Sequence, residues 1–144
     1  MIKLFIPVEP MGAVRMTRAG KYMDSKTSAH YKATQKYLTY KKHIGYIAKQ
    51  HFKAPTEHPI LADITFYMPM PSSWSGKKKD RLNGAVHKSK PDIDNLIKGC
   101  FDSLNKIAWK DDNLVSEVHS RKVYSFNPGI GIEIWELEDE IAVK

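Results

Sequence analysis

A single cysteine, Cys100, occurs among the 144 residues, so the chain cannot form an internal disulfide bond. Cys100 falls on a predicted apolar stripe, where a thiol behaves as a small hydrophobic group. One cysteine also excludes a cysteine-rich zinc site, and the six histidines show no close pairing on one predicted helix face. The sequence therefore predicts neither a disulfide scaffold nor a zinc centre.

Membrane segments and several catalytic motifs are missing as well. No apolar run approaches the length that spans a bilayer, and the first seven residues are too short for a signal peptide and lack its cleavage site. The glycines form no phosphate-binding loop, and no serine or cysteine has a triad signature near it. We therefore expect a cytoplasmic protein with no membrane partner.

Positive charge is what the chain has in excess. Lysine and arginine number 23 against 16 acidic residues, which gives a formal net charge of +7. A basic surface favours a polyanionic partner, because phosphate contacts release condensed counterions. A solvated basic surface without a partner is the alternative that charge alone leaves open.

The periodicity of apolar residues predicts one domain over residues 1–144. Alternation predicts strands over residues 2–6, 60–66, 115–124 and 130–134, and the helical period predicts helices over 28–52 and 93–107. The order β-α-β-α-β-β indicates an α/β (α+β) fold, a mixed sheet packed against two main helices. Residues 72–90 have no core pattern and predict a basic surface loop with room for one short helical turn. Residues 127–129 predict a hairpin connection.

Two aspartates, Asp92 and Asp94, flank Ile93 at the start of the second predicted helix. Ile93 belongs to the apolar stripe, so both carboxylates lie off the core face, where the helix N-terminus stabilises negative charge. Lys98 and Asp102 follow at intervals of four residues and share one polar face. Considered alone, these residues are more often a helix cap and a surface ion pair between Asp94 and Lys98 than a functional site.

A second acidic pair, Asp111 and Asp112, lies beyond the far end of the same helix. It can meet Asp92 and Asp94 only through the tertiary fold. Three converging carboxylates would repel one another and favour a bound hard cation, and oxygen ligands suit Mg²⁺ or Mn²⁺. The alternative is a turn, which Asp-Asp-Asn favours without any metal.

Basic residues gather in two predicted loops that also carry aromatic side chains, Tyr22 and Trp74. Cations near aromatic rings suit contacts with phosphates, bases and sugars, whereas a lysine run alone is usually a solvated surface. The candidate DNA-binding residues are Arg15, Arg18, Lys21, Lys77, Lys78, Lys79, Arg81, Lys88 and Lys90.

Three segments of the chain together resemble the signature of RusA-type Holliday junction resolvases, including phage and prophage members. They are Lys90-Pro91-Asp92-Ile93-Asp94-Asn95-Leu96 followed by Lys98, then Phe101-Asp102-Ser103-Leu104-Asn105, and then Trp109-Lys110-Asp111-Asp112. The similarity runs from about Pro7 to Val123. It implies a bacterial or phage-encoded, homodimeric, Mg²⁺-dependent endodeoxyribonuclease of DNA recombination and repair. Such an enzyme nicks a four-way junction in symmetrical pairs.

The resemblance also implies roles for individual residues. Asp92, Asp94 and Asp112 are the expected metal ligands, with Asp111 as the alternative to Asp112, and Lys98 is the expected catalytic lysine. The cofactor is expected to be Mg²⁺, for which Mn²⁺ can substitute. Two other functions remain open, a nuclease of the same fold that acts mainly on flaps or replication forks, and a basic DNA-binding protein without catalysis.

Overall fold

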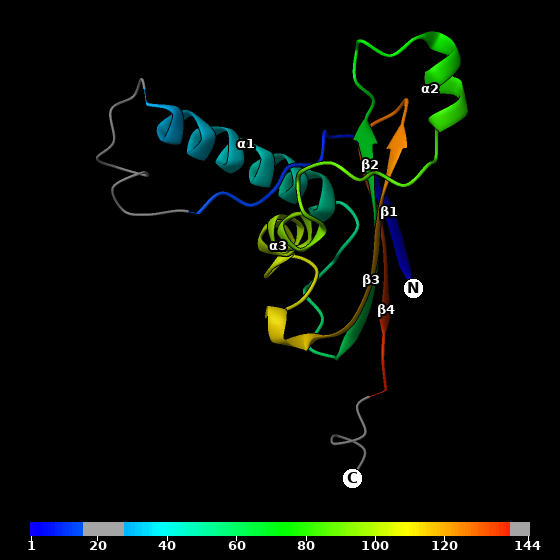
Figure 1. Cartoon of the computed structure of the whole chain (residues 1–144). Coiled ribbons are helices and arrows are strands. Elements are labelled where there is room, and N and C mark those ends of the chain that lie inside the picture. Colours follow the sequence, from blue (N-terminus) through cyan, green and yellow to red (C-terminus); the bar gives the residue numbers. More distant parts are fainter. Residues whose placement is uncertain (16–27, 139–144) are drawn as a thin grey trace.

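The computed structural model describes residues 1–15 and 28–138, and it confirms a mixed α+β fold (Figure 1). Within those residues no helix is both long and apolar enough to cross a membrane. The elements in chain order are β1 (Ile2–Ile6), α1 (Ala29–Lys49), β2 (Ile60–Pro69), α2 (Gly76–Leu82), α3 (Ile93–Leu104), the short 3-10 helix η2 (Asp112–Leu114), β3 (Val115–Ser125) and β4 (Gly129–Glu136).

The four strands form one sheet in the order β1-β4-β2-β3. β2 and β3 run parallel, whereas β4 runs antiparallel to both β1 and β2. Helices α1 and α3 cover one face of this sheet and contact each other (Figure 1). The core lies between the helices and the sheet, and its largest fully buried side chains include Tyr37, Ile44, Phe66, Leu96, Trp109 and Ile132.

Local signals explain the start of α1 and the buried face of α3. Ser28 caps α1, and its hydroxyl accepts a hydrogen bond from the backbone N–H of Tyr31 at 3.0 Å. In α3 the apolar stripe buries Leu96, Cys100 and Leu104 completely, as the helical period predicts. Burial raises the pKa of the Cys100 thiol to about 12, so this cysteine is a core residue rather than a reactive thiol.

The prediction that residues 127–129 connect a hairpin is wrong. β3 and β4 do not pair with each other, because β2 lies between them. β4 is an interior strand whose alternate isoleucines are buried against the helices, whereas β3 is an edge strand with a largely exposed first half. The burial required by alternating isoleucines therefore determined the strand order, and the turn residues did not.

Two helix predictions need correction. Residues 72–90 hold more than one turn of helix, since α2 spans seven residues and Ser75 caps it by accepting from the N–H of Lys78. Helix α3 ends at Leu104 rather than continuing to Ile107, because the chain reverses at Lys106, whose φ is 67°. Ile107 still packs on the core from outside the helix, which is why the apolar period continued past its end.

Candidate nuclease site

The two aspartates at the start of α3 are not used as caps. Asp92 occupies the N-cap position, but its side chain makes no capping hydrogen bond, and Asp94 lies in the first turn. Both side chains are exposed, and neither has an ion pair or side-chain hydrogen bond within the described residues. Two carboxylates without partners, two residues apart at a helix N-terminus, remain available to a ligand.

A lysine from the sheet holds the segment that leads into α3. Lys122 on β3 donates from Nζ to the backbone oxygens of Pro91, at 2.8 Å, and of Ser89. The backbone N–H of His87 donates to the carbonyl of Lys122 at 3.0 Å, so the segment before α3 lies along the edge of β3. Sequence reasoning missed Lys122, because a lysine in a strand of mixed polarity gives no signal of its own.

On the other side of α3, the chain after β1 lies against the helix. Asn95 donates from its side-chain amide to the carbonyl of Ala13 at 3.1 Å and accepts at its backbone oxygen from the N–H of Ala13 at 3.2 Å. A Cβ on Gly12 would lie 2.6 Å from the Asn95 amide nitrogen, so the contact requires glycine there. This close approach places Arg15, with Lys98 and Asp102, around a hollow of about 540 Å³.

Lys98 lies on the same helix as the aspartates and is oriented by Asp102, one turn further along that helix. Its Nζ is 3.6 Å from Oδ2 of Asp102, and the hydroxyl of Tyr37 donates to that same oxygen at 3.1 Å. Burial, and then the Asp102 charge, raise the pKa of Tyr37, so the hydroxyl keeps its proton and remains a donor. Lys98 therefore pairs with Asp102 rather than with Asp94, and Asp94 is left free.

The two candidates for a third carboxylate differ in their surroundings. Asp111 is exposed, and its Oδ1 accepts from the backbone N–H of Asp112 at 2.8 Å, as a local cap of η2 does. Asp112 is half-buried, and its Oδ1 accepts from the indole N–H of Trp109 at 2.7 Å. Trp109 itself is fully buried.

The structure does not gather the three predicted ligands into one shell. Across residues 1–15 and 28–138, no three histidine, cysteine or acidic side chains are placed to hold one metal ion. Lys122 on β3 holds the segment before α3, whereas Asp112 begins η2, just before the start of β3. Assignment of Asp92, Asp94 and Asp112 as metal ligands therefore stays a prediction.

The donor chemistry nevertheless fits a hard cation. Mg²⁺ is often bound by one or two carboxylates together with water and substrate phosphates, rather than by a complete protein cage. Asp92 and Asp94 supply two carboxylates of this kind, and Asp112 has one oxygen, Oδ2, without a hydrogen bond to any described residue. The donors at both positions are carboxylate oxygens, which favour a hard, oxygen-binding metal.

The predicted DNA-binding residues that are described all reach the surface. Lys77, Lys78, Lys79 and Arg81 belong to α2, which lies beyond the ends of β2 and β3 (Figure 1). Lys88 and Lys90 are exposed on the segment that leads to α3. Arg18 and Lys21 lie outside the described residues.

An aromatic cluster fixes α2 to the sheet. The rings of Trp74 and His87 pack on Tyr124 at centroid distances of 4.9 and 4.8 Å, and Nζ of Lys78 lies 4.5 Å from the Trp74 ring. Burial, and then the charge of Lys122, lower the pKa of His87, so this imidazole is neutral at neutral pH. The lysines of α2 therefore belong to a helix that is linked to β3 through Trp74.

Two comparisons with known proteins show which family the chain belongs to. The model of the family described as "Endodeoxyribonuclease RusA" matches residues 7–135, which include α3, Asp112 and β3. A Bacillus subtilis (strain 168) protein described as "Uncharacterized protein YqaN" is 32% identical over 141 residues, covering 94% of this chain and 96% of that protein. With most of its length matched, the chain belongs to the RusA family of endodeoxyribonucleases.

Proposed function

We propose that the protein is a Mg²⁺-dependent, structure-specific endodeoxyribonuclease that resolves four-way DNA junctions by paired symmetrical nicks. The observation that carries the proposal is the start of α3, where Asp92 and Asp94 have no partners and Lys98 lies on the same helix, within a chain of the RusA family. Within the described residues neither carboxylate is used by a capping hydrogen bond or an ion pair, so both are free to bind a ligand.

The proposed roles follow from the surroundings of each residue. Asp92 and Asp94, with Asp112, would hold Mg²⁺, which when bound polarises a phosphodiester and makes water a stronger nucleophile. Lys98, oriented by Asp102, would stabilise negative charge that develops on the phosphate. The cations of α2 and Arg15 would bind the DNA backbone on either side. The expected products are nicks with 5′-phosphate and 3′-hydroxyl ends.

The decisive test is a substrate panel with Mg²⁺. Labelled four-way junction, flap, replication fork and linear duplex would be incubated with the wild-type protein, the Asp92→Asn variant and the Glu133→Gln variant. We expect symmetrical nicks in the junction from wild type and Glu133→Gln, and none from Asp92→Asn. Preferred cutting of flaps or forks would show a different substrate, and equal cutting by Asp92→Asn would remove these carboxylates from the mechanism.

We also propose that the protein acts as a two-fold homodimer, because a junction with two-fold symmetry needs two sites to be cut in both opposed strands. Trp135 remains an exposed aromatic side chain, 45% accessible, that a second copy can cover. Sedimentation with and without junction tests the assembly, and a monomer in both states would contradict it. Mixed dimers with one Asp94→Asn subunit should nick only one strand of each junction.

A further inference from the structure

Trp109, three residues before Asp112, makes a hydrogen bond that its burial alone does not require. Trp109 is fully buried, yet its indole N–H donates at 2.7 Å to a carboxylate, Oδ1 of Asp112. A buried indole needs an acceptor, and a backbone carbonyl would satisfy that need. Its partner is instead one of the carboxylates that the proposed function uses.

The ring of Trp109 is held firmly in place. The rings of Phe101 on α3 and Trp109 meet edge-to-face, with a centroid distance of 5.3 Å. The two residues that flank Trp109 also hydrogen-bond to Thr56, whose N–H donates to the carbonyl of Ala108 at 3.1 Å and whose carbonyl accepts from the N–H of Lys110 at 3.0 Å. The indole N–H therefore points to one fixed place.

The bond leaves half of the carboxylate free. Oδ1 of Asp112 is occupied by the indole, and Oδ2 has no hydrogen bond to any residue in the described part of the chain. Asp111, the neighbouring candidate, instead accepts from the backbone N–H of Asp112. Of the two, only Asp112 is oriented by a rigid side chain from the core.

We infer that Trp109 is a positioning residue for the nuclease site. Its indole holds one oxygen of Asp112 and leaves the other free, so that this oxygen would be available to the metal. This inference rests on the proposed function, since it assumes that Asp112 takes part in the reaction. Partners that orient a metal-binding carboxylate are commonly worth about 10- to 100-fold in metal affinity or activity.

The test is the Trp109→Phe variant, which keeps an aromatic ring but removes the indole N–H that donates to Asp112. We expect the Mg²⁺ concentration for half-maximal junction cleavage to rise about 10-fold or more, while junction affinity without metal stays the same. Phe101→Leu is the matched control. It loosens the same aromatic contact without touching the hydrogen bond, so it should lower stability and leave the Mg²⁺ dependence unchanged.

A second measurement on the wild-type protein covers the case in which Trp109→Phe does not fold. Mg²⁺ would be added to the complex with a four-way junction whose scissile linkages are phosphorothioates, and the indole N–H resonances would be followed by NMR. The resonance of Trp109 should move with Mg²⁺, while that of Trp135 should not. An unmoved Trp109 resonance would overturn the inference.

The Asp112→Asn variant separates failure of the inference from failure of the proposed function. If Asp112→Asn cuts normally, Asp112 is not part of the site and the proposed function loses its third carboxylate. If Asp112→Asn is inactive but Trp109→Phe shows the wild-type Mg²⁺ dependence, only the positioning role is lost. A rise in Mg²⁺ requirement shared by Trp109→Phe and Phe101→Leu would reduce the effect to packing.

Discussion

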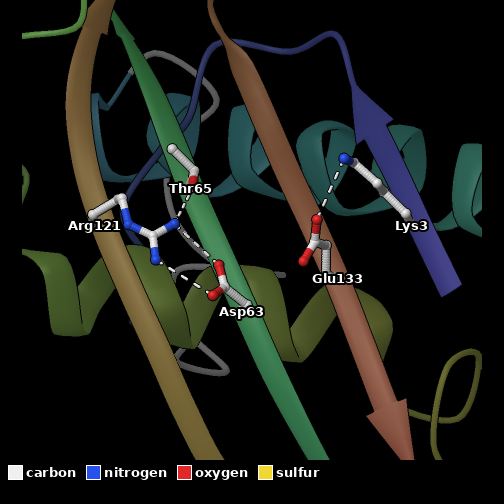
Figure 2. A network of polar contacts seen from close by, with 5 residues as sticks. All are labelled: Lys3, Asp63, Thr65, Arg121 and Glu133. Carbon is white, nitrogen blue, oxygen red and sulfur yellow. Dashed lines mark hydrogen bonds and ion pairs between the residues drawn. The ribbon is translucent and has the colours of Figure 1, made fainter. Parts of the chain in front are cut away.

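The face of the sheet that α1 and α3 leave uncovered, here called the open face, carries carboxylates that are paired with cations, whereas the carboxylates at the start of α3 are not. On the open face, Asp63 accepts two hydrogen bonds from Arg121, at 3.0 and 3.3 Å, and Glu133 lies 3.4 Å from Lys3 (Figure 2). Asp92 and Asp94 have no such partner among the described residues. The same side chain is thus structural in one region and available to a ligand in the other.

Strand register explains the pairing on the open face. Lys3 lies directly opposite Glu133 in the antiparallel pair of β1 and β4, and Arg121 lies opposite Thr65, one position along the same face from Asp63. Opposite charges at such positions stabilise a sheet by a few tenths of a kcal/mol to about 1 kcal/mol. Within the described residues the start of α3 has no comparable ion pair, because Lys98 is paired with Asp102 and Lys122 donates to the backbone oxygens of Ser89 and Pro91.

The largest expected effect is the loss of an unpaired carboxylate. Asp94→Asn should lower junction cleavage by ~100-fold or more, because a metal ligand contributes several kcal/mol of charge stabilisation to the transition state. Junction binding should be kept or tightened, since one negative charge leaves a phosphate-binding site. Single-turnover cleavage and binding at equal salt measure the two effects. The matched control is Glu133→Gln on the open face, which should cut normally.

A smaller effect is expected from the lysine of the same helix. Lys98→Gln should lower the cleavage rate by about 10- to 100-fold, the range typical of one charged or hydrogen-bonding group at the reacting phosphate. Binding should change little, since one of many cations is lost. Lys36→Gln, on the exposed side of α1, is the control for the loss of one charge. Equal effects on rate and affinity would make Lys98 a binding residue.

Changes in α2 should affect binding without affecting the chemical step. Lys78→Gln should flatten the dependence of log affinity on log salt by about 1, as expected for one lost phosphate contact. Lys3→Gln on the open face removes the same charge from a cation that already has an acidic partner, so its salt slope should stay at the wild-type value. Equal slopes for the two variants would remove α2 from the DNA interface.

Most of the helices and strands and the aspartates of the candidate site could be predicted from the sequence, whereas the strand order and several supporting residues could not. Local periodicity placed β1, α1, β2, α3 and β3 within a few residues, because the burial pattern is written into each segment. Strand order depends on contacts between distant segments, and the prediction of a β3–β4 hairpin was therefore wrong. The aspartates were found from their motif. The roles of Lys122 and Tyr37 were not, since they arise from contacts between distant elements. Trp109 stands in the same motif, but its hydrogen bond to Asp112, three residues away, was not predicted.

The smallest expected effect concerns the open face itself. Asp63→Asn should lower the free energy of unfolding by at most about 1 kcal/mol, because ion pairs that remain partly exposed gain little over solvated charges. Junction cleavage should be unchanged. A double-mutant cycle with Arg121→Gln, read by urea unfolding, isolates the pair, and its coupling energy should shrink as salt is raised. Thr65 also accepts from Arg121, so part of the arginine's contribution will remain when Asp63 is replaced. Should Asp63→Asn reduce cleavage as strongly as Asp94→Asn, the presence of a paired cation would not be what distinguishes the two kinds of carboxylate.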